Sequence, residues 1–128
     1  MKHDSLSDMF TILMNTETVG KISCTVPSSK VIKEILKTMQ KKGYIGNFEL
    51  IDDGKSGKFK IEMIGKINKC GVIKPRHAVG LRSFINWEKR YLPAVGMGEL
   101  FVSTPEGVMS HRDAAEKKSG GVLLGYIY

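Results

Sequence analysis

Residues 27–64, PSSKVIKEILKTMQKKGYIGNFELIDDGKSGKFKIEMI, decide the fold because they pass from helical to strand periodicity. Apolar residues recur every three or four positions from Ile32 to Met39, which predicts a helix that begins at residues 27–29 and ends at Gly43. In residues 58–64 apolar and charged residues alternate instead, as in a strand with one buried face. Residues 44–51 are the expected partner strand and 52–57 the turn, so a helix followed by a β-hairpin is predicted.

The segment before this stretch adds a helix and a strand. In residues 5–16, Leu6, Met9 and Phe10 begin one apolar helical face, and residues 21–26 alternate as a short strand. The order helix, strand, helix, strand, strand is typical of an α+β unit in which helices cover a small sheet. We therefore expect an N-terminal α/β lobe over residues 1–65.

The remaining residues, 66–128, predict a mainly β C-terminal lobe with one short helix. Its first part, 66–98, is a less regular basic connection with one or two helical turns at 87–91. Strands are expected at 99–103 and 122–128. Between them, Ser110 and Asp113 form a capping box that opens a short helix, and Gly120 and Gly121 end it. His111 is expected to be exposed in the first turn. The predicted fold class is α+β with two small lobes.

The charge balance favours a polyanionic partner. Lys and Arg number 20 against 13 Asp and Glu, a net charge of +7. Nucleic acid and anionic membranes are therefore the first partners to consider, and an ordinary basic protein is the alternative. The longest apolar run, residues 122–128, is too short to span a bilayer, so no membrane association is expected. Cys24 and Cys70 are isolated, which predicts core thiols in a reduced, cytoplasmic protein.

Residues that commonly catalyse reactions or bind metals are scattered along the chain. His3, His77 and His111 lack the spacing of a zinc site, and no phosphate-binding loop pattern occurs. A hydrolase built on His111 and Asp113 is disfavoured, because two residues two positions apart on one helix point to different sides. We therefore expect no enzymatic activity, no metal, no cofactor and no small-molecule substrate.

Two segments are candidates for binding nucleic acid. Residues 103–110 are expected to join a strand to a helix and to present hydroxyl groups and free amides, which suit phosphates, riboses or base edges. An ordinary turn capped by Ser103 and Thr104 is the alternative, and composition alone favours it. Four lysines between residues 30 and 41 share one side of the predicted helix, either as a solvated face or as a polyanion-binding surface.

Residues 103–109, Ser-Thr-Pro-Glu-Gly-Val-Met, resemble the Ser-Thr-x-x-Gly-Val-Met signature of the small-subunit ribosomal protein eight family. The resemblance covers the whole chain, because further family motifs follow in order. They are Gly43-Tyr44-Ile45-Gly46, residues 65–73, Lys74-Pro75-Arg76, Leu92-Pro93 and Gly120-Gly121. The Lys-Cys-Gly and Pro-Arg stretches are similar to the archaeal and eukaryotic cytosolic branch rather than to the bacterial one.

The resemblance implies a non-catalytic cytoplasmic protein of the ribosome, built from two α/β lobes. It implies direct binding to the central domain of the small-subunit ribosomal RNA early in assembly, with that RNA and neighbouring ribosomal proteins as partners. The implied RNA-binding residues are Ser103, Thr104, Gly107, Val108, Gly120, Gly121, Lys74, Arg76, Ser29, Lys30 and Lys33. A translational repressor that binds an mRNA mimic of the ribosomal site is the alternative.

Two positions depart from the pattern usual in bacterial members. Pro105 stands where a third hydroxyl residue is usual, and Val122 stands where a glutamate follows the paired glycines. Whatever those two side chains do in other members therefore does not carry over to this chain, and the hydrogen bonding at the RNA is expected to differ.

Overall fold

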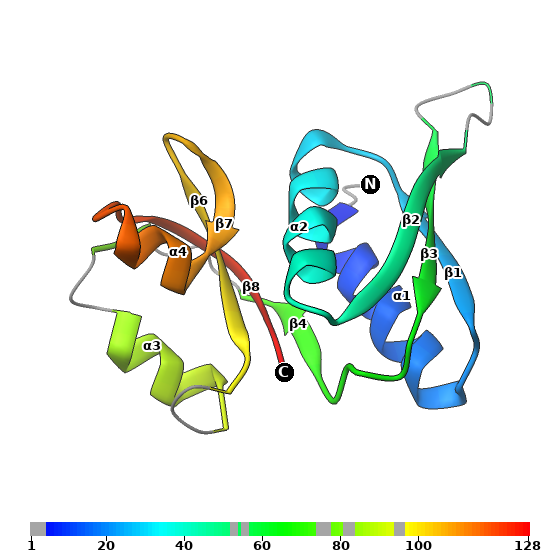
Figure 1. The fold of residues 1–128 in the computed structure, drawn as a ribbon, viewed down its shortest axis with the longest axis horizontal. Helices are drawn as coiled ribbons and strands as arrows, with labels where there is room; N and C mark the ends of the chain where they lie inside the picture. Colours follow the sequence, from blue (N-terminus) through cyan, green and yellow to red (C-terminus); the bar gives the residue numbers. More distant parts are fainter. Residues whose placement is uncertain (1–4, 52–53, 55–56, 74–77, 81–83, 94–96) are drawn as a thin grey trace. The chain divides into compact units, whose positions relative to one another are not determined.

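Two antiparallel sheets, each accompanied by helices, make up the fold (Figure 1). The computed structural model describes residues 5–51, 54, 57–73, 78–80, 84–93 and 97–128. The chain divides into two compact units, Met1–Asn68 and Lys69–Tyr128. The α+β fold class predicted from the sequence is confirmed.

The first unit contains two helices and a three-stranded sheet in the order β1-β3-β2. Its elements are α1 (Ser5–Val19), β1 (Ser23–Pro27), α2 (Lys30–Lys41), β2 (Ile45–Ile51) and β3 (Lys58–Met63). The predicted order of helix, strand, helix and hairpin is therefore confirmed. The first helix runs three residues beyond its predicted end at residue 16, and in this last turn the Thr18 hydroxyl donates a hydrogen bond to the carbonyl of Met14 at 2.8 Å.

The alternation in β3 determines which face of this sheet is covered. The apolar residues of this strand, Phe59, Ile61 and Met63, are buried. The charged residues that alternate with them, Lys58, Lys60 and Glu62, are exposed. In Figure 1 both helices lie against the same side of the sheet. Their apolar faces form the core with the β3 residues, through Met9, Phe10, Leu13, Ile35, Leu36 and Met39.

Both ends of α2 are explained by their local sequence. Ser29 is the N-cap, and its Oγ accepts a hydrogen bond from the backbone N–H of Ile32 at 3.2 Å. After the last turn Gly43 adopts φ +85°, a left-handed conformation that glycine enters without steric cost.

The second unit contains a sheet in the order β4-β8-β6-β7, with β5 also paired to β8. Its elements are β4 (Cys70–Val72), β5 (Ala78–Val79), α3 (Phe84–Tyr91), β6 (Glu99–Thr104), β7 (Gly107–Ser110), α4 (His111–Glu116) and β8 (Gly121–Ile127). Side chains from α3, α4 and three strands of the sheet form one core. Its buried members are Ile73, Phe84, Leu92, Leu100, Val102, Met109, Ala114 and Leu123.

The prediction for residues 103–110 was wrong about their conformation. They do not form an irregular strand-to-helix connection, because β6 and β7 pair as a tight hairpin whose turn is Pro105-Glu106. The hairpin extends the sheet, and its two strands stay paired up to Thr104 and Gly107, next to the turn. The strand β7 then leads directly into α4.

Among the described residues, no helix is both long and apolar enough to cross a membrane.

Candidate nucleic-acid interface

The tip of the β6–β7 hairpin is closed by the side chain of Thr104. Its hydroxyl donates a hydrogen bond to the carbonyl of Gly107 at 2.8 Å and accepts one from the N–H of Glu106 at 3.2 Å. Gly107 has φ +125°, which favours glycine. The single hydroxyl proton of Thr104 is thus engaged inside the turn, so this residue shapes the tip and retains only accepting capacity toward a ligand.

Ser103 lies at the centre of a small strip on the face of the sheet opposite the core. Its cross-strand partners are Val108 on β7 and Val122 on β8. All three residues are half-buried. The Ser103 hydroxyl has no hydrogen-bond partner within the described part of the chain, so it can both donate to and accept from a ligand. A free hydroxyl between two branched apolar side chains is the main polar feature of this strip.

Gly121 brings the start of β8 against the backbone of Ser103. A Cβ at this position would lie 2.2 Å from the carbonyl oxygen of Ser103, which no side chain can tolerate. Gly120 precedes it and accepts a hydrogen bond from the Ser119 hydroxyl at 3.3 Å. The structure therefore brings together Ser103, Thr104, Gly107, Val108 and Gly121, the residues that the sequence singled out in this unit, with Gly120 next to them in the chain.

Helix α4 supports the hairpin from the core side. Ser110 caps it, because its Oγ accepts a hydrogen bond from the N–H of Asp113 at 3.3 Å, as the capping box predicted. The expectation that His111 is exposed was wrong, since its relative exposure is 2%. The ring lies against the edge of Phe84, with 6.2 Å between the centroids.

Both ring nitrogens of His111 have partners. Nδ1 accepts a hydrogen bond from the N–H of Leu100 at 3.0 Å, and Nε2 lies 2.5 Å from Oε1 of Glu88. An accepting Nδ1 requires the proton on Nε2, so the ring is neutral and donates to Glu88. Burial lowers the pKa of His111, and the Glu88 carboxylate opposes this shift. The imidazole therefore holds α3 and β6 together and has no nitrogen left for catalysis.

An ion pair lies next to this histidine, between a partly exposed arginine and a buried glutamate. Arg112 forms an ion pair with the buried Glu99, and its Nη1 donates a hydrogen bond to the carbonyl of Gly98 at 2.8 Å. The contact joins α4 to the start of β6. Both strands of the hairpin are thus anchored to α4, β6 at its start and β7 through the Ser110 cap.

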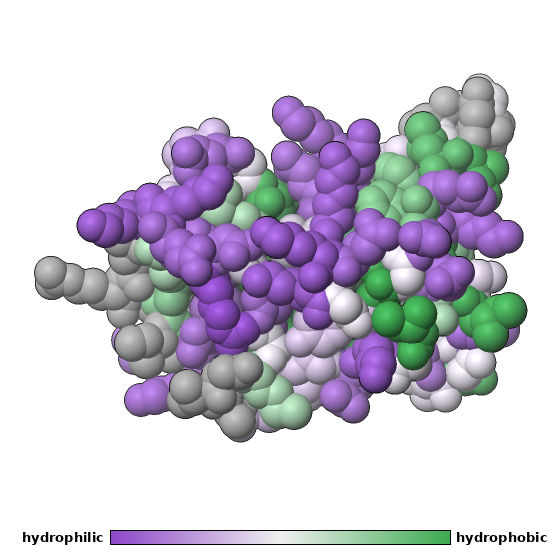
Figure 2. All heavy atoms as spheres, in the orientation of Figure 1, coloured by the Kyte–Doolittle hydropathy of each residue, from purple (hydrophilic) through white to green (hydrophobic). Residues whose placement is uncertain are grey.

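In the first unit the candidate residues Ser29, Lys30 and Lys33 lie together at a hollow of about 610 Å³. The hollow lies between the first turns of α2 and the strands β2 and β3. Its remaining lining residues are Ser28, Phe48, Glu49, Leu50 and Phe59. In Figure 2 the region of α2 is covered by hydrophilic side chains, consistent with its exposed lysines.

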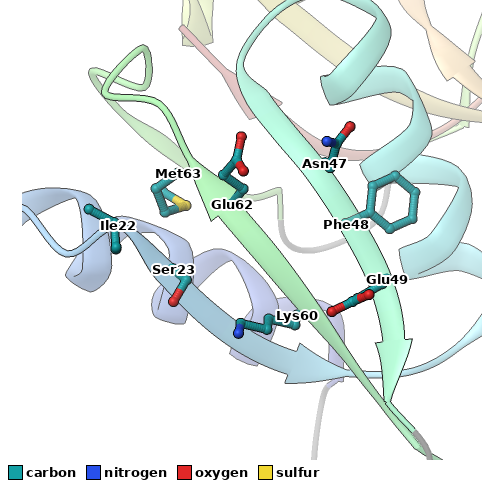
Figure 3. Close-up of a pocket in the computed structure, with 8 residues that line it drawn as sticks. All are labelled: Ile22, Ser23, Asn47, Phe48, Glu49, Lys60, Glu62 and Met63. Atoms are coloured by element: carbon teal, nitrogen blue, oxygen red, sulfur yellow. The ribbon is translucent and has the colours of Figure 1, made fainter.

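A second hollow of about 650 Å³ lies on the open face of the same sheet (Figure 3). There Lys60 lies beside Glu49, and Glu62 projects from the same strand as Lys60. Its other lining residues are Ile22, Ser23, Asn47, Phe48 and Met63. Two carboxylates against one ammonium group make this hollow unfavourable for a polyanion, whereas the hollow at α2 has two lysines against Glu49.

Lys74 and Arg76, the remaining candidates, lie outside the described residues. Within the described residues, no group of three or more His, Cys, Asp or Glu is arranged to hold a metal ion. Two features were missed in the sequence. One is the apolar wall that Phe48 and Leu50 form in the α2 hollow. The other is a column of stacked aromatic rings in the second unit, made by Trp87, Tyr91, Tyr126 and Tyr128. The i, i+4 spacing of Trp87 and Tyr91 could have indicated the column.

Comparison with known proteins is consistent with these observations. A family model described as ribosomal protein S8 matches residues 4–128. The chain is 51% identical over 126 residues to the small ribosomal subunit protein uS8 of Methanococcoides burtonii, which covers 98% of this chain and 97% of that protein. It is 53% identical over 124 residues to the small ribosomal subunit protein uS8 of Nitrosopumilus maritimus. That alignment covers 96% of this chain and 95% of the relative.

Proposed function

Because the chain belongs to the ribosomal protein S8 family, we propose that it binds directly to the central domain of the small-subunit ribosomal RNA and helps that domain to assemble. Its role is that of a structural, non-enzymatic component of the small ribosomal subunit. Its partners are ribosomal RNA and neighbouring ribosomal proteins, and it is located in cytoplasmic ribosomes.

The observation that carries this proposal is the strip of Ser103, Val108 and Val122 beside the closed hairpin tip. RNA minor grooves are wide and shallow and are lined by 2′-hydroxyl groups, which pair well with short hydroxyl side chains and backbone amides. The Ser103 hydroxyl can donate to or accept from a ribose. Gly107 and Gly121 add no side chain that would keep the RNA backbone away.

Lysines and arginines supply the affinity that does not depend on sequence. The net charge of +7 attracts the phosphate backbone, and release of counterions makes such binding salt-dependent. Ser29, Lys30 and Lys33 are proposed to contact a second segment of the same RNA. The family resemblance adds Lys74 and Arg76 to the proposed contacts.

The test is a titration of the purified protein with a central-domain RNA fragment over a salt series. We expect Ser103→Ala to raise the dissociation constant about five- to tenfold, equivalent to loss of ~1 kcal/mol from one hydrogen bond. Ser23→Ala removes a half-buried serine from the mixed-charge hollow of the first unit and is the matched control. Weak binding of equal strength to any RNA, with no effect of Ser103→Ala, would contradict the proposed function.

A further inference from the structure

The hollow at the start of α2 combines an apolar wall with a basic, hydroxyl-bearing rim. Leu50 on β2 is 60% exposed, although it lies on the same face of the sheet as the buried Phe59, its cross-strand partner. Phe48 is half-buried and meets Phe59 edge to face, with 5.7 Å between the ring centroids and 81° between the planes. Figure 3 shows the ring of Phe48 on the α2 side of its strand.

This wall is unusual because the remaining exposed residues of the hollow are polar or charged. β2 is the edge strand of its sheet, and within the described residues Leu50 stays 60% exposed and Phe48 half-buried. Exposure of this leucine and of the aromatic ring to water is unfavourable, and covering both with a flat apolar group lowers the free energy. The wall therefore fits a planar ligand that stacks or packs against it.

The rim supplies groups that bind phosphate and ribose. Lys30 and Lys33 are exposed on the first turn of α2, and Ser28 and Ser29 line the hollow beside them. The Ser29 oxygen accepts from the Ile32 N–H, which leaves its hydroxyl proton available to a ligand. Two ammonium groups against the single carboxylate of Glu49 favour an anion.

We propose that this hollow holds one unpaired nucleotide of the bound RNA. Its base packs on Leu50 and Phe48, and its phosphate and ribose lie at the lysines and serines of the rim. A volume of about 610 Å³ accommodates a nucleotide, and recognition of RNA through bases splayed out of a helix onto apolar or aromatic side chains is a general mode. The proposal rests on the proposed function and adds the kind of RNA element that the first unit recognises.

An extended acidic peptide added to the free edge of β2 is the competing occupant. It would use the same lysines, but it gains most of its affinity from backbone pairing and needs no hydroxyl-lined pocket. A nucleotide uses the apolar wall, the hydroxyl groups and the lysines together, so the observations favour it.

The test compares Leu50→Ser with Ile51→Ser in the full-length protein. Ile51 is the next residue on the same edge strand, is also exposed and does not line the hollow, which makes it a matched control. Unpaired purines of the central-domain fragment are replaced one at a time by 2-aminopurine, and fluorescence is recorded as protein is added. We expect one position to change its emission with wild type and with Ile51→Ser, but not with Leu50→Ser.

Affinity gives an independent reading. Leu50→Ser should raise the dissociation constant about fivefold or more without changing the salt slope, because no charge is lost. If Leu50→Ser binds like wild type and no purine responds while Ser103→Ala still weakens binding, the nucleotide site is wrong and the proposed function stands. If Leu50→Ser instead prevents only the joining of a neighbouring ribosomal protein, the occupant is a peptide. If neither wild type nor any variant binds the central-domain fragment specifically, the proposed function itself is contradicted.

Discussion

His111 shows how one residue can appear functional in the sequence and be structural in the molecule. A histidine close to a serine and an aspartate suggests catalysis, yet its two nitrogens bind Leu100 and Glu88 in the interior. The sequence could not predict this, because Glu88 and Leu100 are 23 and 11 positions away and only the folded sheet brings them to the ring. The role of Ser110 as a helix cap was predictable, because its partner Asp113 is only three residues away.

Replacing His111 should destabilise the second unit. In His111→Leu the buried N–H of Leu100 loses its acceptor, and the Glu88 carboxylate loses its donor. We expect the free energy of unfolding to fall by about 2 kcal/mol, the usual cost of an unsatisfied buried polar group. Urea denaturation followed by circular dichroism measures it, and Lys118→Ala, an exposed change after the same helix, is the control. Equal stability of the two variants would contradict the structural role.

The lowered pKa of His111 predicts how stability depends on pH. Well above pH 6.5, the ordinary pKa of histidine, the imidazole is neutral in both the folded and the unfolded state, and the contribution of this group to stability is at its maximum. As the pH falls below 6.5 the unfolded chain takes up a proton before the folded protein does, so the free energy of unfolding decreases until the folded pKa is passed. Arg112 opposes protonation, whereas Glu88 and Glu99 favour it. Denaturation curves between about pH 5 and 8 should show this decrease in wild type and a smaller one in His111→Gln.

Position 121 requires glycine because the start of β8 lies so close to β6. Gly121→Ala would push the start of β8 away from the Ser103 carbonyl, and we expect a loss of about 1–3 kcal/mol in unfolding free energy, as for overpacking. Because Ser103 moves with that contact, RNA affinity should also fall. Gly80→Ala is the control, since a Cβ there meets nothing within 4 Å. Full stability and affinity of Gly121→Ala would show that the strands are not in close contact.

At the scale of elements, periodic segments were predictable and short ones were not. The helix α2 and the strand β3 each carry a complete period in their own residues, so pattern alone identified them. The two- and three-residue strands β5 and β4 are too short to show a period and exist only by pairing with β8. The β6–β7 hairpin was missed because a Pro-Glu turn lacks the Asn-Gly or Asp-Gly signature of a two-residue hairpin loop.

Helix α3 is attached to the sheet by a column of four aromatic rings. Tyr91 stacks on Trp87 and on Tyr126, with centroid separations of 6.0 and 5.4 Å, and Tyr128 continues the column beyond Tyr126 at 6.2 Å. The guanidinium of Arg90 lies 5.3 Å from the Trp87 ring. The column therefore links α3 to β8 and to the residue after it.

Tyr91 is the member of this column that joins the helix to the strand. We expect Tyr91→Ala to lower the unfolding free energy by about 3 kcal/mol, from lost burial and two stacking contacts. Lys89→Ala, an exposed change on the same helix, should have little effect. Trp87 is the only tryptophan, so its fluorescence reports this site directly, and an unchanged emission spectrum in Tyr91→Ala would argue against the stacking.

At the scale of the whole molecule, the fold determines where the charged side chains gather. Net charge was readable from composition, but the sequence did not show that one hollow carries lysines and the other mostly carboxylates. The strands β2 and β3 place residues from distant positions around each hollow. Only the fold therefore separates a basic surface from a mixed one.

Two double variants with the same change in net charge test this difference. Lys30→Gln/Lys33→Gln and Lys58→Gln/Lys60→Gln each lower the charge of +7 by two. The first should reduce the slope of log affinity against log salt by up to about 1.5, because two phosphate contacts are lost, and the second should reduce it only slightly. Equal slopes for the two variants would mean that binding depends on total charge alone.

The closed turn at Thr104 has a consequence for how fast the protein finds its RNA. Because the hydroxyl already bridges Glu106 and Gly107, the hairpin tip is preorganised and has little conformational entropy left to lose on association. Encounter should then be limited by diffusion and orientation, as for rigid partners, and not by a folding step in the loop. A Thr104→Val substitution, which opens the bridge and keeps the shape of the side chain, would transfer that ordering cost to the moment of binding.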